Sequence, residues 1–185
     1  MNKSNAPSYI SVYEGGFFMK KIIIPVILVS ILLVSCTAGV DSERFFDYQK
    51  KDLSVAGKWT ENSAEYGVVL TMSAPGEKDG VRKFMKIEFT SPETVAGTAY
   101  VFEDGELTAA LGDMTVPVNA ENAEKVFRIA EMFSLKSEDI RNISVDKDGK
   151  TVAVGKGWEV TTGEKGKPVR IVTENSSLDI DKFEG

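Results

Sequence analysis

The side chains that most often perform chemistry in proteins are nearly missing from this chain, which has one cysteine and no histidine in 185 residues. Without histidine the chain lacks the usual general base and the usual nitrogen ligand of zinc. Its one thiol, Cys36, lies at the end of an apolar stretch that closes with Leu33-Val34-Ser35-Cys36. We therefore predict no enzyme, no metal site and no cofactor, and Cys36 becomes the residue whose position points to chemistry.

The segment before Cys36 has the three parts of an export signal when it is read from Met19. Two lysines follow Met19, apolar residues continue to Val34, and the small residue Ser35 precedes Cys36. The apolar span is shorter than the roughly 20 residues that a transmembrane helix needs. The last four residues resemble the lipobox of bacterial lipoproteins. This resemblance implies that the Cys36 thiol receives a diacylglyceryl group and that Cys36 becomes the first residue of the mature protein.

Residues 1–18 look like neither a folded element nor a targeting signal. The stretch 14–19 can be encoded by codons that contain AGGAGG, the purine-rich ribosome-binding sequence of bacteria, just upstream of the Met19 codon. We therefore expect translation to begin at Met19. The predicted organisation is an upstream extension that is not translated (1–18), a lipoprotein signal peptide (19–35), a lipidated tether (36–40) and one domain (41–185).

Charge limits the partners of the mature chain. The residues before Cys36 contain three lysines and one glutamate, so the rest of the chain has 19 Lys and Arg against 27 Asp and Glu, a net charge of −8. This balance argues against nucleic acid and against electrostatic docking on anionic lipid. Membrane attachment would then depend on the acyl chains on Cys36. The expected location is the outer face of the cytoplasmic membrane, or a periplasm-facing or outer membrane if the source has two membranes.

Apolar periodicity predicts two helices and about ten strands in residues 41–185. The first helix is expected from Asp41 to Leu53. The second helix is expected to begin at Asn119, with one apolar face and one solvent-facing side that includes Arg128. The apolar face consists of Ala123, Val126, Phe127, Ala130 and Phe133, and it is widened by Ile129 and Met132. Alternation with a period of two predicts strands with one buried face at 54–60, 66–72, 84–89, 97–102, 106–111, 114–118, 143–145, 151–154, 158–162, 169–173 and 178–183.

The turns favour antiparallel neighbours. Asp104-Gly105 and Gly112-Asp113 lie between apolar runs and supply the positive φ angles of tight hairpins. So many strands in one domain predict a single large sheet that curves, with the helices on its concave side. The expected fold class is α+β, mainly antiparallel β: a curved, unclosed half-barrel of about ten strands covered on its concave face by short helices.

This order of elements resembles the LolA/LolB-like superfamily over nearly all of residues 41–183. The residues that carry the resemblance are 46–49, 87–92 with 97–102, 167–171 and 178–180. The superfamily includes a periplasmic carrier and an outer-membrane receptor for lipoproteins. The resemblance implies an N-terminal helix followed by an unclosed half-barrel with an apolar concave face. The predicted lipid anchor departs from the soluble carrier, so shuttling between two membranes is not expected in a source that has only one.

Large apolar side chains on the buried faces could either fill a core or line a cavity, and the sequence leaves both readings open. Methionine and aromatic walls adapt well to acyl chains. The candidates for cavity lining are Trp59, Tyr66, Val68, Leu70, Met85, Ile87, Phe89, Tyr100, Phe102, Met132 and Phe133. The first hypothesis is non-catalytic binding of an acyl chain, a lipid or another amphiphile. The alternative is a scaffold whose acidic surface or exposed sheet edge docks another envelope protein.

Two further patterns favour ordinary surface roles. Residues 144–149 superficially resemble a calcium loop, but Gly155 stands at the twelfth position, where a bidentate glutamate is required, so a hairpin turn is favoured. The acidic pairs Glu103-Asp104, Glu138-Asp139 and Asp179 with Asp181 fall at turns, helix ends or outer strand faces. We expect them to be solvated groups and not catalytic acids.

Overall fold

The computed structural model of this chain describes Ser42, residues 44–119 and residues 124–185. The chain divides into two compact units, Met1–Gly39 and Val40–Gly185, and every described residue belongs to the second. The predicted extension 1–18, the signal peptide 19–35 and the tether 36–40 with Cys36 lie outside the described residues.

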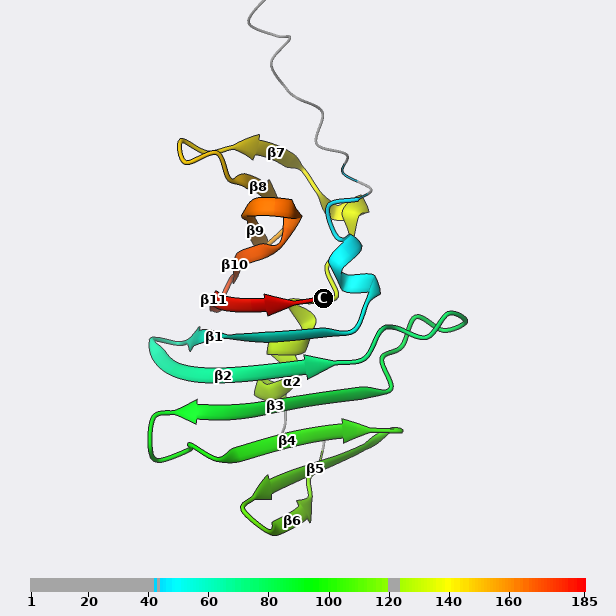
Figure 1. The fold of residues 1–185 in the computed structure, drawn as a ribbon, viewed down its shortest axis with the longest axis vertical. Coiled ribbons are helices and arrows are strands. Elements are labelled where there is room, and N and C mark those ends of the chain that lie inside the picture. The colour runs from blue at the N-terminus through cyan, green and yellow to red at the C-terminus, as the bar shows by residue number, and fades with distance from the viewer. Residues whose placement is uncertain (1–41, 43, 120–123) are drawn as a thin grey trace, which may run out of the picture. The chain divides into compact units, whose positions relative to one another are not determined.

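Eleven strands form one antiparallel sheet in the order β6-β5-β4-β3-β2-β1-β11-β10-β9-β8-β7. Their bounds are β1 Leu53–Glu61, β2 Ala64–Met72, β3 Phe84–Ser91, β4 Thr98–Glu103, β5 Glu106–Leu111, β6 Met114–Pro117, β7 Asn142–Val145, β8 Thr151–Val154, β9 Trp158–Thr162, β10 Pro168–Thr173 and β11 Ser176–Glu184. Two meanders therefore meet where β1 pairs with β11. Within the described part of the chain β6 and β7 pair on one side only, so the sheet is unclosed and the predicted fold class is confirmed (Figure 1).

The alternation with a period of two gives the sheet one buried face. In β1 the side chains of Leu53, Val55 and Trp59 are buried, whereas Lys58 is exposed. β2, β3, β9 and β10 continue this core with Leu70, Ile87, Val160 and Ile171, among others. The expectation fails at β6, where all four residues are exposed, because no other element covers that end of the sheet within the described residues.

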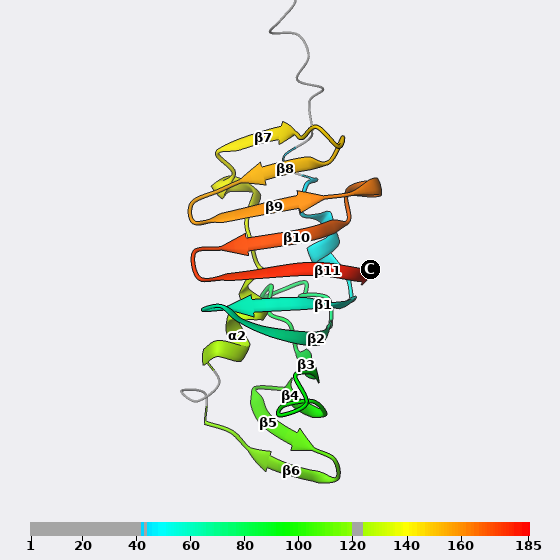
Figure 2. The same ribbon diagram turned by 90° about the vertical axis from the view of Figure 1, so that its left-hand side faces the viewer.

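The sheet twists and curves along its length. Figure 1 shows β1 to β5 broadside and β8 to β10 nearly edge-on, whereas Figure 2 shows β8 to β11 broadside and β3 and β4 foreshortened. Register shifts between Ala56 and Gly57 in the β1–β11 pair, and between Gly67 and Val68 in the β2–β3 pair, contribute to this, because bulges increase local twist. A Cβ at Gly57 would lie 2.1 Å from the carbonyl oxygen of Asp179, so only glycine fits there.

The first predicted helix is wrong in length. In place of this helix the described chain has one 3₁₀ turn, η1 (Asp47–Lys50), and Leu53 already belongs to β1. Asp41 lies outside the described residues. The ring of Phe46 packs 5.6 Å from that of Trp158, and the ring of Tyr48 packs 5.7 Å from that of Phe183. These aromatic contacts with β9 and β11 fix the segment as a turn, because burial outweighs the weak preference of a short helix.

The second helix, α2 (Glu124–Glu131), is shorter than expected and ends before Phe133. Residues 120–123, including Ala123 of the predicted apolar face, lie outside the described residues. Val126, Ile129, Met132 and Phe133 are buried. Arg128, expected on the solvent side, is partly exposed (34%), and its guanidinium faces Glu61, a buried carboxylate at the end of β1.

Elsewhere in the described residues the helical segments are single 3₁₀ turns, η3 (Ser137–Asp139) and η4 (Glu164–Gly166). The cover over the buried face of the sheet therefore consists of η1, α2 and the segment that follows α2 to η3. Helical cover is sparse, and most of it is irregular chain. This leaves room between the cover and the sheet.

Candidate functional site

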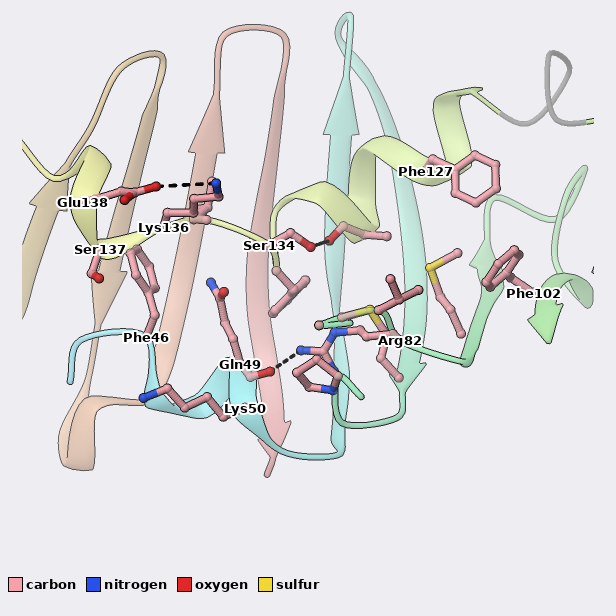
Figure 3. A pocket seen from close by; sticks show the side chains of 18 residues that line it. Phe46, Gln49, Lys50, Arg82, Phe102, Phe127, Ser134, Lys136, Ser137 and Glu138 are labelled. Carbon is pink, nitrogen blue, oxygen red and sulfur yellow. Dashed lines mark hydrogen bonds and ion pairs between the residues drawn. The ribbon is translucent and has the colours of Figure 1, made fainter. Parts of the chain in front are cut away.

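A cavity of about 740 Å³ lies between the sheet and the segments that cover it, and it opens to solvent (Figure 3). Its apolar lining comes from Phe46, Met72, Pro75, Val81, Met85, Phe102, Phe127, Ala130, Phe133 and Leu135. Its polar lining comes from Gln49, Lys50, Arg82, Ser134, Lys136, Ser137 and Glu138, and Gly80 completes it. The volume lies within the roughly 300–1,000 Å³ of small-molecule sites.

The sequence placed eleven residues as candidates for such a lining, and the structure brings three of them, Met85, Phe102 and Phe133, to the cavity. The others pack in or against the core: Trp59, Val68, Leu70, Ile87, Phe89 and Met132 are buried, and Tyr66 and Tyr100 are partly buried. Four of these form a row of rings, Trp59–Tyr66–Phe89–Tyr100, with centroids 5.4, 5.7 and 6.2 Å apart. These rings pack against one another as part of the core and at its margin.

Aromatic side chains stand at both ends of the cavity. Figure 3 shows Phe46 at one end and the Phe102–Phe127 pair at the other. The rings of Phe102 on β4 and Phe127 on α2 meet edge-to-face, with centroids 6.3 Å apart, and both are only partly buried. The cavity thus offers two aromatic ends and a methionine wall, formed by Met72 and Met85, to an elongated apolar molecule.

Arg82 joins three backbone segments beside the cavity. Its guanidinium donates hydrogen bonds to the carbonyl oxygens of Gln49 and Ser73, and a longer one of 3.3 Å to that of Lys51. Partial burial lowers the pKa of this guanidinium, and the nearby Asp52 carboxylate opposes that shift. The arginine therefore holds the entry of the chain into β1 against the loop that leads into β3.

Gln49 completes this connection from the other side. With its amide nitrogen turned toward the cover, it donates to the carbonyl oxygens of Phe133 at 3.3 Å and Leu135 at 3.0 Å. Figure 3 shows Gln49 and Arg82 side by side between the aromatic ends. η1, the loop before β3 and the segment after α2 are thus linked around one opening. Nothing in the sequence pairs Gln49 with Arg82, since 33 residues separate them.

The two lysines at the opening are each paired with a carboxylate. Lys50 Nζ lies 2.7 Å from Asp47 Oδ1, and Lys136 Nζ lies 3.4 Å from Glu138 Oε1. The hydrogen bond from Lys50 lowers the pKa of the exposed Asp47 carboxyl. The rim is therefore polar and close to neutral, while the interior is mostly apolar, an arrangement that suits a molecule with one polar and one apolar end.

The helix α2 is tied to the sheet by a contact that the sequence did not reveal. Arg128 Nη1 lies 2.5 Å from Glu61 Oε1, and the Glu61 side chain is 4% exposed. A buried carboxylate needs a partner, and the arginine supplies one. A glutamate at a strand end gives no signal of this role, because it resembles an ordinary solvated charge.

The stretch 144–149, which superficially resembles a calcium loop, belongs to β7 and to the hairpin turn after it. Residues 146–150 form the turn between β7 and β8, where the Asp146 carboxylate accepts hydrogen bonds from the backbone of Asp148 and Lys150. Across the part of the chain that the structure describes, no group of three or more acidic, histidine or cysteine residues could hold a metal ion. None of the helices in that part has the length and apolar character needed to cross a bilayer.

Comparison with known proteins gives structural likenesses only. No protein-family model matches the chain, and no curated protein does. An uncharacterised conserved protein from Thermus thermophilus is 14% identical with a TM-score of 0.44, over 78% of this chain and 83% of that one. A putative outer membrane lipoprotein-sorting protein domain from Vibrio parahaemolyticus is 13% identical with a TM-score of 0.42, over 79% and 91%. A LolA superfamily protein from Nitrosomonas europaea is 11% identical with a TM-score of 0.41, over 79% and 94%.

At these identities and TM-scores the likenesses carry no inference about function. The fold assignment rests on the chain's own strand order, an unclosed antiparallel sheet with sparse helical cover.

Proposed function

We propose that this protein is a non-catalytic binding protein that holds an acyl chain, or the apolar part of a similar amphiphile, in the cavity beneath α2. The observation that carries this proposal is the lining: ten apolar residues surround about 740 Å³ that opens at a polar rim. An acyl chain would lie along Met72 and Met85 between the aromatic ends, and its head group would remain near Lys50 and Lys136.

We further propose that the protein acts at a membrane surface, held there by lipid on Cys36. The lipobox-like run that ends at Cys36 and the lysine-led apolar segment before it support this. The acidic balance of the chain supports it indirectly, because it gives no electrostatic route to an anionic bilayer. Lipidation places the cavity within reach of amphiphiles that leave or enter the membrane.

Binding of a fluorescent fatty acid tests the cavity. The unit Val40–Gly185, which is compact by itself, would be titrated into dansylaminoundecanoic acid, and a rise and blue shift of the emission would report transfer to an apolar site. Ala130→Trp adds a large side chain on the cavity wall and should weaken binding at least tenfold. Ala64→Trp makes the same change at an exposed position of β2 and should leave binding unaltered. An Ala130→Trp variant that folds and binds like the parent would refute this location.

A further inference from the structure

Exposed large apolar side chains gather at the two edges of the sheet. Among the described residues five are more than half exposed, and four of them belong to the edges: Leu111 (51%), Met114 (67%) and Val116 (56%) at the β6 edge, and Val145 (57%) on β7. Exposed apolar residues are normally scattered singly over a surface. Their concentration at unpaired sheet edges indicates that these edges bind a partner.

The two edge strands carry only part of the protection that natural edge strands usually have. β6 has the sequence Met-Thr-Val-Pro and β7 has Asn-Ile-Ser-Val, so neither contains a charged residue. Charges, bulges and prolines are the common means of preventing edge pairing. Here the protection consists of the four-residue length of both strands and of Pro117 at the end of β6. Both edges can therefore accept another strand.

The apolar side chains of both edges lie on the same face of the sheet. Val116 is opposite Ala109, which is opposite Tyr100, which is opposite the fully buried Ile87. Opposite residues share a face, so Val116 and Met114 lie on the core face. At the other edge Ile143 is opposite the fully buried Ala153, which places Ile143 and Val145 on that face too.

The two edges also run in the same direction. All ten pairs of neighbours in the eleven-stranded sheet are antiparallel, so the first and last strands, β6 and β7, are parallel to each other in the sense of the sheet. A second copy that continued the sheet with its core face on the same side would therefore place its β7 parallel to β6 of the first copy. Figure 2 shows the two edges far apart at opposite ends of one copy.

The backbone groups of the two edges match this arrangement. Val118 donates to the Leu107 carbonyl on β5, so by alternation Thr115 directs its N–H and C=O away from β5. Asp146 donates to the Lys150 carbonyl, so Ile143 and Val145 direct theirs away from β8. With Thr115 opposite Ser144 in a parallel pair, Thr115 N–H reaches the Ile143 carbonyl and Val145 N–H reaches the Thr115 carbonyl.

This register also pairs the apolar side chains of the two edges, of which Met114, Val116 and Val145 are exposed and Ile143 is partly buried. Met114 of one copy stands beside Ile143 of the other, and Val116 beside Val145, all on the core face. The charges are complementary: residues 98–119 carry four acidic residues and no Lys or Arg, whereas residues 141–156 carry four basic and two acidic ones. Pairing of two β6 edges would instead bring the acidic hairpins together, which disfavours a symmetric contact.

We propose that copies of this protein associate head to tail, with the β6 edge of one copy paired to the β7 edge of the next. Two short strands, one ending in a proline, give a weak contact in dilute solution. A common membrane surface raises the effective concentration of the copies and so favours it. Because the contact is heterologous, each new copy leaves one free edge of each kind and the association can repeat.

Cysteine cross-linking of the full chain in cells tests this proposal. Thr115 and Ser144 are exposed, and adjacent strands lie about 4.8 Å apart, within the roughly 4.4–6.8 Å between Cα atoms that a disulfide requires. A double variant, Thr115→Cys with Ser144→Cys, should give a ladder of dimers, trimers and larger species under a mild oxidant. Either variant alone should give none, and the two single variants expressed together should stop at the dimer. The unaltered chain controls for Cys36.

Three outcomes would overturn the proposal: no ladder from the double variant, a dimer from Thr115→Cys alone, which would indicate symmetric pairing, or a product that contains a different protein. Val145→Asp in the double-cysteine chain should reduce the ladder at least tenfold. Val101→Asp makes the same change on β4, opposite Lys86 and away from both edges, and should leave the ladder intact. Equal ladders from these two variants would show that the apolar edge makes no contribution.

Discussion

Arg128 Nη1 lies 2.5 Å from Glu61 Oε1, and this contact joins the helix that covers the cavity to the end of the first strand. The helix α2 has only eight residues, a length at which an isolated helix is marginal in water. Its place over the sheet therefore depends on the packing of Ile129 and Met132 below it and on this ion pair.

Removing either member of the pair should destabilise the domain by different amounts. Arg128→Met leaves the buried Glu61 carboxylate without this partner, and we expect a loss of about 2–4 kcal/mol in the free energy of unfolding. Glu61→Gln leaves a neutral amide beside a half-exposed arginine and should cost less. Urea denaturation of the two variants and of the double variant gives the coupling energy; strictly additive effects would mean that the pair does not stabilise the fold.

Arg82 should not be replaceable by lysine. Its planar guanidinium serves the carbonyl oxygens of Gln49, Ser73 and Lys51 together, whereas an ammonium group cannot reach all three. We expect Arg82→Lys to lower the free energy of unfolding by about 1–3 kcal/mol. Backbone amides in η1 should also exchange their hydrogens faster.

Arg170→Lys provides the matched control for that change. Arg170 makes an exposed pair with Asp179 at 2.9 Å, so the same substitution there should change stability by less than about 1 kcal/mol. If both variants behave alike, Arg82 has no special part in holding the cavity together.

The strands could be predicted from the sequence because their signals are local. The alternation of Val55, Gly57 and Trp59, and the Asp104-Gly105 turn, act within a few residues, and every predicted strand is present within two residues of its expected bounds. The first helix was predicted too long for a different reason. Phe46 and Tyr48 are buried by contacts with β9 and β11. In the sequence, apolar residues buried by such distant contacts look the same as the apolar face of a helix.

The cavity was harder to predict than the fold. Met85 and Phe102 lie on strands whose buried faces were recognised, so both could be proposed as lining. Gln49 and Arg82 come from a turn and a loop that meet only in three dimensions. The sequence also could not distinguish residues that fill the core from residues that line the cavity. Both kinds lie on the same buried face of the sheet, beneath different covering segments.

Cys36 should carry fatty acid in cells. Growth with an alkyne-tagged palmitate, followed by coupling to a dye, should label the full chain, and Cys36→Ala should abolish the label and release the protein from the membrane fraction or block its processing. Because Cys36 is the only cysteine, no other thiol can account for a signal. Label that survives in Cys36→Ala would show that the lipobox interpretation is wrong.

Stability should fall at high pH because of Tyr48. Burial raises the pKa of its phenol above the ordinary value, whereas in the unfolded chain a tyrosine titrates near pH 10. Below that pH the folded and unfolded chains hold the same phenolic proton, and the stability is fully present. Above it the unfolded chain releases a proton that the folded chain keeps, so the free energy of unfolding falls by about 1.4 kcal/mol per pH unit from this residue alone.

Tyr48→Phe removes this dependence while every lysine and every other tyrosine stays, so the difference between the two chains in urea denaturation from pH 8 to 11 isolates Tyr48. Parallel curves over that range would mean that the phenol ionises in the folded protein as easily as in the unfolded one, and that the aromatic contact with Phe183 leaves it open to water.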